Sequence, residues 1–400
     1  MNLKPYLLAL LTTTAFAQKV QKKTQADLIV TNAKIYTVNK DFEVTQALAV
    51  KDGKILEVGT NSVILKSFTS PKIINATGKY IYPGFYDAHA HFHSYGLNLQ
   101  RVDLRGTKSF DEVIAKIVAF QKEHNLDYIQ GRGWDQNDWA IKEFPNKEQL
   151  DKLFPNTPVA ITRIDGHALL ANSKALQMAG ITAKTKIEGG EIELKNGQLT
   201  GILIDNPMEL VYNSIPKPSK EIQIKALQDA EKVMFDYGLT TINEAGLERE
   251  TIDLINELQE ENKLDINIYA MVMASKENVD YYTQLGIYKT DKLNVRSFKF
   301  MGDGALGSRG ACLHKEYSDK PKHFGALLSP IKDIRAIAQQ IADSEFQMNT
   351  HAIGDSTNSV LLKIYKDVLA GKPDRRWKIE HAQIMQEQDF EYFKLGIIPS

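Results

Sequence analysis

Apolar and polar residues alternate along the first part of the chain, after a short N-terminal apolar run. Four segments show this period of two: 28–31, 33–38, 47–50 and 54–58. Turn residues separate them, and one more short apolar segment lies within 71–77. Such alternation is typical of half-buried strands. The pattern therefore predicts a small antiparallel β unit over residues 26–78.

The pattern changes after Gly84. Residues 85–91 form an apolar run with a polar end, and from Ser219 onward helical and strand patterns alternate. The expected helices are 110–124, a helix capped by Ser219 and ended by Gly238, then 251–262, 277–285, one opened by Pro330, one around 360–368, and 386–394. The expected strands between them are 239–244, 266–272, 295–301, 346–351, 377–381 and 397–398. Strands spaced by helices imply a parallel sheet, whereas residues 125–216 give no clear assignment.

The N-terminus has the pattern of an export signal. One lysine is followed by the apolar run 5–11 and by a small-residue site ending at Ala17. This predicts a signal peptide over residues 1–17, cleaved after Ala17, and a polar tether over 18–25. A membrane anchor is the alternative, but the run is shorter than the roughly 20 residues that a span needs. We therefore expect a periplasmic or secreted protein without a stable membrane span.

Composition excludes several classes of protein. The chain has 400 residues, 49 Lys and Arg against 50 Asp and Glu, and a net charge of -1. This balance gives no reason to expect a nucleic-acid partner, because phosphate binding needs a positive excess. The single cysteine, Cys312, excludes an internal disulfide and a thiolate-rich zinc site.

Four histidines occupy the ends of predicted strands. They are His89 and His91, then His351, then His381. Residues i and i+2 of a strand point to one face, and the carboxyl ends of parallel barrel strands open on one face. Imidazoles that converge there can bind a metal ion. Each histidine alone could equally be a hydrogen-bonded core residue, and His93, His124, His314 and His323 lack this placement.

Several longer motifs resemble a known family. Residues 27–37, 50–55 and 76–91 are similar to the opening of the amidohydrolase superfamily. The segments 131–135, 158–167, 172–176, 303–309 and 351–355 resemble its YtcJ-like branch, amidohydrolase family 3, which includes N-substituted formamide deformylase. The resemblance runs from about Asp27 to Ser400.

The resemblance implies a fold and a metal centre. The fold is an α/β (β/α)8 barrel over residues 79–400, with residues 26–78 as the N-terminal part of a composite β-sandwich domain. His89 and His91 would bind one ion and His351 and His381 a second. Lys299 would be carboxylated and bridge two divalent ions, which we expect to be zinc, with iron or manganese as alternatives. An unmodified Lys299 with its stem on apolar surface remains the alternative.

The resemblance also implies which groups act on the substrate. The superfamily's proton donor is an aspartate at the end of strand eight, and we expect the chain to be cut in strand seven, before this residue. No other catalytic residue is identified by motif; Asp303 and Asp355 do not replace it, and we expect Asp87 to orient a histidine ligand. Trp134, His167 and Arg309 are candidate substrate contacts. Glu244 would line the mouth of the barrel or accept a hydrogen bond.

These features predict a metal-dependent hydrolase acting on a carbon–nitrogen bond, other than a peptide bond, of a small amide such as an N-formyl or N-acyl amine. A mononuclear deaminase of the same superfamily is one alternative. A truncated, inactive fragment that binds metal is another. The substrate, the number of ions and the oligomeric state are not specified by the sequence.

Overall fold

The computed structural model describes residues 22–164, 166, 168–187, 190–205, 207–304, 306, 310–318 and 321–400. The predicted signal peptide, 1–17, lies outside these residues. The chain divides between Phe85 and Tyr86 into two compact units. Within the described residues, no helix combines the length and apolar character needed to cross a bilayer.

The N-terminal unit contains two small sheets. One has the order β6 (Lys54–Gly59), β5 (Ala47–Lys51), β2 (Leu28–Thr31), β8 (Ile73–Asn75), and the other β4 (Val44–Thr45), β3 (Lys34–Tyr36), β9 (Tyr80–Ile81). The hairpin partners pair antiparallel as predicted. The prediction is wrong for β8, which lies parallel to β2; β9, which follows the predicted unit, lies parallel to β3. Helix α1 (Asn61–Ser67) returns the chain between β6 and β8, and such a crossover allows parallel pairing.

The expected tether ends earlier than predicted. Thr24–Gln25 form strand β1, which pairs in parallel with β7 (Phe68–Thr69). Ala26, which follows β1, is fully buried in a small core with Ile29 and Ile64. Polar composition alone did not show this, because β1 is held by backbone hydrogen bonds and not by apolar side chains.

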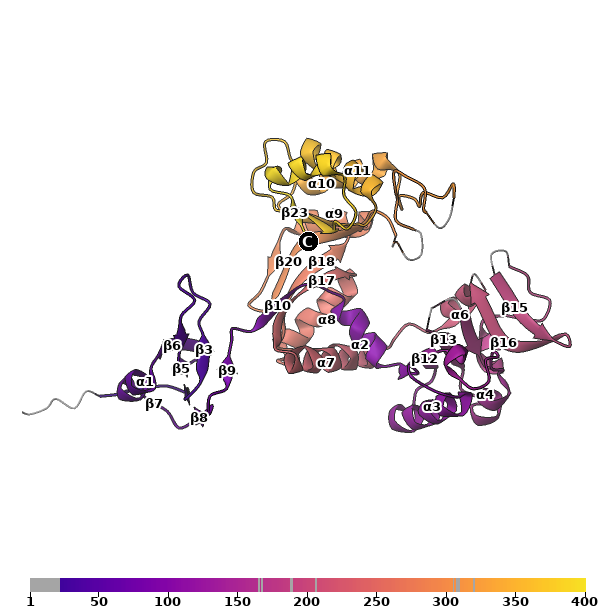
Figure 1. The fold of residues 1–400 in the computed structure, drawn as a ribbon, viewed down its shortest axis with the longest axis horizontal. Coiled ribbons are helices and arrows are strands. Elements are labelled where there is room, and N and C mark those ends of the chain that lie inside the picture. The colour runs from indigo at the N-terminus through magenta and orange to yellow at the C-terminus, as the bar shows by residue number, and fades with distance from the viewer. Residues whose placement is uncertain are drawn as a thin grey trace, which may run out of the picture. The chain divides into compact units, whose positions relative to one another are not determined.

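A parallel half-barrel sheet organises the second unit (Figure 1). Its described strands follow the order β10 (Phe85–Ala90), β17 (Leu239–Leu247), β18 (Asn267–Met273), β20 (Leu293–Met301), β21 (Gln347–Ala352), β22 (Lys378–His381), β23 (Ile398–Pro399). The neighbours on this path from β17 to β23 pair in parallel, whereas β19 (Tyr288–Lys289), off the path, pairs antiparallel with β20. This confirms the predicted α/β class with a parallel sheet; seven strands of the expected barrel lie on this path among the described residues.

Helices cover one face of this sheet. They are α7 (Lys220–Asp236), α8 (Arg249–Glu260), α9 (Lys276–Leu285), α10 (Ile331–Ala342) and α11 (Asp355–Val368). Alternate strand residues such as Ile268, Phe298 and Met348 join the apolar core beneath them. Ser219 caps α7 as predicted, because its hydroxyl accepts a hydrogen bond from the Ile222 amide.

Two predicted helix details differ. Residues Glu387–Leu395 form a 3-10 helix and not an α-helix, and Gly396 ends it with a φ of 82°. Pro330 occupies the capping position of α10, with ψ at 141°, so the helix begins at Ile331.

A second sheet interrupts the expected barrel. Between α2 (Phe92–Leu99) and α7, the chain forms a six-stranded sheet of order β11 (Val102–Asp103), β12 (Ile129–Trp134), β13 (Val159–Arg163), β14 (Ala168–Ala171), β16 (Gln198–Asp205), β15 (Gly190–Lys195). The predicted helix 110–124 is present as α3 (Phe110–His124), but it packs on this inserted sheet. The remaining helices here are α4 (Glu148–Leu153), α5 (Ser173–Met178) and α6 (Met208–Ser214).

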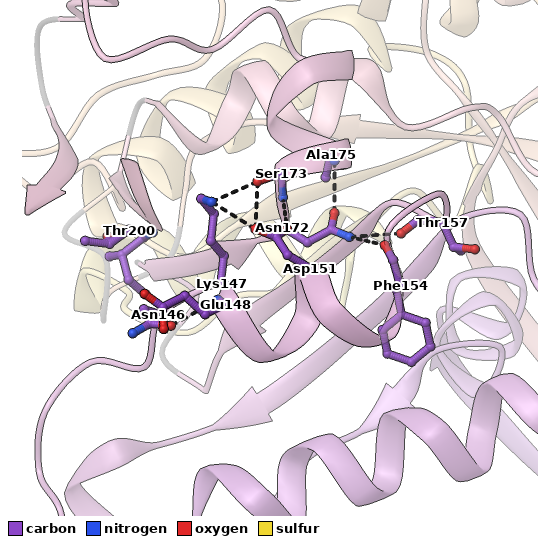
Figure 2. Close-up of polar contacts among 11 residues, drawn as sticks. Asn146, Lys147, Glu148, Asp151, Phe154, Thr157, Asn172, Ser173, Ala175 and Thr200 are labelled. Carbon is purple, nitrogen blue, oxygen red and sulfur yellow. Dashed lines mark hydrogen bonds and ion pairs between the residues drawn. The ribbon is translucent and has the colours of Figure 1, made fainter. Parts of the chain in front are cut away.

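A buried asparagine ties the inserted sheet together (Figure 2). Asn172 is fully buried; its Oδ1 accepts from the amides of Val159 and Ala175, and its Nδ2 donates to the carbonyls of Phe154 and Thr157. Beside it, the Lys147 ammonium, the Asp151 carboxylate and the Ser173 hydroxyl bond to one another. Every polar atom of the Asn172 amide thus has a partner, which is what burial of an amide requires.

Candidate metal centre

The four predicted histidines lie together at the carboxyl ends of three strands. The ring centroids of His89 and His91 are 5.3 Å apart, those of His89 and His381 4.9 Å, and those of His351 and His381 4.7 Å. β10 supplies His89, His91 directly follows β10 at the start of α2, β21 supplies His351 and β22 supplies His381. The parallel order of the strands therefore brings the four rings to one place, as expected from the sequence.

His381 takes an unusual backbone conformation. Its φ is 75°, and that of Ala382 is 37°. Residues other than glycine seldom adopt this left-handed region, and such strain collects at functional sites. The conformation turns the His381 side chain out of the regular alternation of β22, toward His89 and His351.

A buried glutamate orients the His89 ring. Nδ1 of His89 lies 2.6 Å from Oε2 of Glu380, whose side chain is 1% exposed. His89 Nε2 is buried and has no hydrogen-bond partner among the described residues. A carboxylate on one ring nitrogen fixes the tautomer and leaves the lone pair of the other nitrogen available for a metal. Contacts with the His89 ring, the Lys378 ammonium and Lys299 offset burial and lower the pKa of Glu380.

Sequence reasoning assigned this role to the wrong carboxylate. Asp87 accepts a hydrogen bond from the backbone amide of His89, at 3.0 Å, and not from a histidine ring. Glu380 was missed because it precedes His381 in its strand, where regular alternation would direct it to the opposite face. Its position depends on the parallel register that pairs His351 with Glu380, which the sequence alone does not show.

Lys299 lies in β20, the strand next to β21, which carries His351. Phe298 and Phe300 point into the helix-covered core, so Lys299 between them points to the other face of the sheet, where it is 2% exposed. Burial lowers the pKa of Lys299 to about 8, although Glu380 acts to raise it. Gly246, with a φ of 115°, leaves space here; a Cβ on it would lie 3.5 Å from Cγ of Lys299 and 2.7 Å from the Met273 sulfur.

The other rings are neutral at pH 7. Burial lowers the pKa of His91 and His351 and lowers that of His381 to about 4. The neighbouring rings and the Lys299 ammonium act in the same direction. Neutral imidazole carries the lone pair that a metal ion requires.

His351 is held by the segment that follows β20. A hydrogen bond to the backbone of Gly304 raises the pKa of His351, opposing burial, and Asp303 Oδ1 lies 3.7 Å from His351 Nε2. That Nε2 atom is buried and has no hydrogen-bond partner among the described residues.

These residues fit a divalent metal ion by their chemistry. Two buried imidazole nitrogens lack partners, and unpaired buried polar atoms are costly without a ligand. In the part of the chain that the structure describes, no three His, Cys, Asp or Glu side chains are arranged so that they could hold a metal ion as a group. The fit therefore rests on the unpaired nitrogens, the orienting Glu380 and the spacing of the rings.

Glu244 accepts hydrogen bonds and does not line an open mouth. It is 1% exposed, and its Oε2 accepts from the backbone amide of Phe92, directly after His91. Burial raises the pKa of Glu244 to about 8, against the opposing effect of hydrogen bonds from Phe92 and His93. The side chain thus holds the start of α2 in place.

The structure describes one of the three predicted substrate contacts, Trp134. Trp134 is fully buried in the core of the inserted sheet, and its Nε1 donates to the Ile161 carbonyl at 3.0 Å. That position gives it a packing role and no surface for a substrate. His167 and Arg309 lie outside the described residues.

A well-formed cavity lies at the other end of the strands. Its volume is about 590 Å³, and Tyr269, Arg296 and Gln347 at the amino ends of β18, β20 and β21 line it. Barrel chemistry is found at the carboxyl ends, so the histidine cluster and not this cavity is the candidate site.

The chain is similar to proteins of known family. The amidohydrolase family matches residues 72–396. The protein LONG AFTER FAR-RED 3 of Arabidopsis thaliana is 32% identical over 379 residues, 90% of this chain and 64% of that protein. A Bacillus subtilis protein named "Putative amidohydrolase YtcJ" is 29% identical, over 89% of this chain and 69% of its own length.

Two further proteins extend the comparison. The N-substituted formamide deformylase of Arthrobacter pascens is 24% identical, over 90% of this chain and 69% of its own. The crystal structure of a metal-dependent hydrolase from Pyrococcus horikoshii superimposes with a TM-score of 0.76 at 27% identity, over 93% of this chain and 74% of that one. The chain spans about two thirds of the length of the curated relatives named here.

Proposed function

Since this chain belongs to the amidohydrolase family of metal-dependent hydrolases, we propose that it hydrolyses a carbon–nitrogen bond, other than a peptide bond, in a small amide such as an N-formyl or N-acyl amine. The convergence of four histidine rings beside Lys299, with unpaired buried nitrogens, carries the proposal. The relative named N-substituted formamide deformylase supports this substrate class.

The proposed ligand set uses the chain's own residues in two groups. His89 and His91 hold one divalent ion, and His351 and His381 hold a second; zinc, iron and manganese all suit this donor set. Ions in such a centre lower the pKa of water and polarise a carbonyl group. Glu380 keeps the His89 ring in the tautomer that leaves Nε2 free to bind.

Lys299 is proposed to bridge the two groups as a carbamate. A free ammonium has no lone pair, so the lysine must first react: its neutral amine attacks the carbon of carbon dioxide, forms an N–C bond and releases one proton. With its pKa at about 8, roughly a tenth of the amine is neutral at pH 7. The burial that lowers its pKa thus prepares Lys299 for a reaction that an exposed lysine makes less readily.

Metal content and amide hydrolysis test the proposal together. The purified chain should contain two equivalents of divalent metal by mass spectrometry and release amine from members of an N-formyl and N-acyl amine panel. A chelator should abolish amine release, and zinc or manganese should restore it. His351→Asn should lose metal, whereas His314→Asn, at an exposed histidine that contacts Ser359, should not. Amine release that is indifferent to chelation would refute the proposed chemistry.

A single-ion deaminase is the competing function within the superfamily. Lys299→Ala separates the two, because loss of the bridge should leave one equivalent of metal where the wild type holds two. One equivalent in both proteins, with ammonia released from an aminated heterocycle, would instead support the deaminase. Bound metal without hydrolysis of the amides and without release of ammonia from the heterocycle would support the inactive, metal-binding alternative.

We also propose export of the protein. The support is the N-terminal sequence, with its apolar run and Ala17 site. Expression in a bacterial host, followed by mass measurement of the protein released from the periplasm, should show a chain that begins at Gln18. An intact N-terminus in the cytoplasmic fraction would contradict export.

A further inference from the structure

Asp303 is a fully buried carboxylate that joins three segments of the chain. Its Oδ2 accepts hydrogen bonds from the amides of Cys312 and Gly354, both at 2.9 Å, and from the Thr357 hydroxyl at 2.8 Å. Its Oδ1 accepts from the Ile353 amide at 3.0 Å. Four hydrogen bonds thus converge on this one buried carboxylate.

Two of the three segments border His351, and the third, at Cys312, contacts them both. Asp303 follows β20 by two residues, Cys312 ends the segment that continues from it, and Ile353 and Gly354 form the turn between β21 and α11. His351 lies two residues before that turn. Its ring bonds to the backbone of Gly304, the neighbour of Asp303, and its Nε2 is 3.7 Å from Asp303 Oδ1.

Glycines allow these segments to pack without any intervening side chain. A Cβ on Gly354 would lie 2.0 Å from the Cys312 carbonyl oxygen, and a Cβ on Gly302 would lie 2.6 Å from the His351 carbonyl oxygen. Neither distance is possible for a real side chain, so the backbones touch directly. Asp303 thus sits at the centre of a rigid backbone junction and not on a surface loop.

We propose that Asp303 is a positioning residue that fixes His351 for the second metal ion. It holds the turn after β21 through Ile353 and Gly354, and it holds Gly304, whose backbone sets the orientation of the His351 ring. Both restraints leave His351 Nε2 aimed into the site with no competing partner. This inference rests on the proposed function, because it assigns His351 to that ion.

The geometry predicts why asparagine cannot replace Asp303. Both carboxylate oxygens accept from N–H donors, so in either orientation of an amide its NH2 group would face at least one N–H. Asp303→Asn should therefore bind the second metal ion at least about tenfold more weakly, as supporting residues of metal ligands commonly do. The first ion, on His89 and His91, should bind as in the wild type. Asp389→Asn is the matched control, since Asp389 is likewise buried, at 2% exposed, but bonds to Ser359.

Titration calorimetry with zinc on the metal-free, full-length proteins measures both affinities, and circular dichroism checks that each variant is folded. Two wild-type affinities in Asp303→Asn would overturn the inference, and so would an equal loss of both ions in Asp303→Asn and Asp389→Asn. A wild type that binds fewer than two ions would refute the proposed two-metal site itself, which is a distinct result.

Two substitutions of Thr357 test the role of Asp303 if Asp303→Asn does not fold. Thr357→Val retains the shape of the side chain and removes one of the four donors, whereas Thr357→Ser keeps the hydroxyl. The second ion should bind several-fold more weakly to Thr357→Val and normally to Thr357→Ser. Equal second-ion affinity in the two variants would overturn the role of Asp303.

Discussion

At the scale of single residues, Glu380 fixes the orientation of the His89 ring, a proposed metal ligand. Its Oε2 lies 2.6 Å from His89 Nδ1, deep in the sheet. We expect Glu380→Ala to weaken metal binding by about 10- to 100-fold, because the His89 ring loses both its fixed tautomer and its fixed rotation. Competition with a chromophoric chelator measures the affinity. The exposed Glu387→Ala serves as the control, and similar affinities in the two variants would contradict the orienting role.

The histidines could be predicted one by one, and their supporting carboxylates could not. Strand alternation and a shared strand end are visible in the sequence, and they placed His89, His91, His351 and His381 correctly together. Glu380 and Asp303 depend on contacts between segments far apart in the sequence. Glu380, for example, is 291 positions away from His89. No local pattern encodes a hydrogen bond of that kind.

At the scale of secondary-structure elements, Asn172 holds α5 and β13 to the loop before them. Asn172→Ala would remove four hydrogen bonds and leave the buried amides of Val159 and Ala175 and the carbonyls of Phe154 and Thr157 without this partner. We expect a loss of unfolding free energy of about 2–4 kcal/mol, since each buried group left unpaired costs about 1–3 kcal/mol and relaxation recovers part of it. Urea unfolding measures it.

Asn146 provides the control for that substitution. It is exposed, and its Oδ1 accepts one hydrogen bond from the Glu148 amide (Figure 2). Asn146→Ala should cost about 1 kcal/mol or less, the usual net value of one exposed hydrogen bond. If both substitutions cost the same, Asn172 does not have the central role that its contacts indicate.

Elements with strong local patterns were predictable, and elements defined by pairing were not. Helix α3 has the predicted bounds, because Ser109 caps it and Asn125 ends it with a φ of 46°. The inserted sheet was missed because its buried strands β13 and β14 are short and lack polar alternation. Apolar runs of this length fit a strand or a buried helix equally well. The parallel placement of β8 and β9 likewise depends on partners that the strand sequence does not specify.

At the scale of the whole molecule, motifs that mark the family do not all mark the metal centre. The segment 131–135 contributes Trp134 to the core of the inserted sheet. The segment 172–176 contributes Asn172, whose buried side-chain amide holds neighbouring backbone segments by hydrogen bonds. The segment 351–355, by contrast, contains His351 and the turn that Asp303 holds. A family motif therefore does not say by itself whether its residues pack in a core or belong to the metal centre. The fold distinguishes these two roles.

The free energy of unfolding of the whole protein should depend on pH through one buried acid, Glu244. Its folded pKa, about 8, lies above its unfolded value of 4.5, so the protonated form is the one that the fold favours. Its contribution to stability is complete below pH 4.5 and is lost as the pH rises through 8. Relative to Glu244→Gln, which stays neutral, the wild type should lose on the order of several kcal/mol of unfolding free energy between pH 4.5 and 8.

Urea unfolding of the metal-free proteins at several pH values between 4.5 and 8 tests this sign. Asp151→Asn is the control, because the Lys147 ammonium and the Ser173 amide outweigh partial burial and lower the pKa of Asp151. A depressed carboxylate pKa stabilises above the unfolded value of 3.8 and is lost only in acid, so the difference between Asp151→Asn and wild type should stay constant over the same range. A wild type that instead gains stability over Glu244→Gln as the pH rises would show that the Phe92 and His93 amides, and not burial, determine the charge of Glu244.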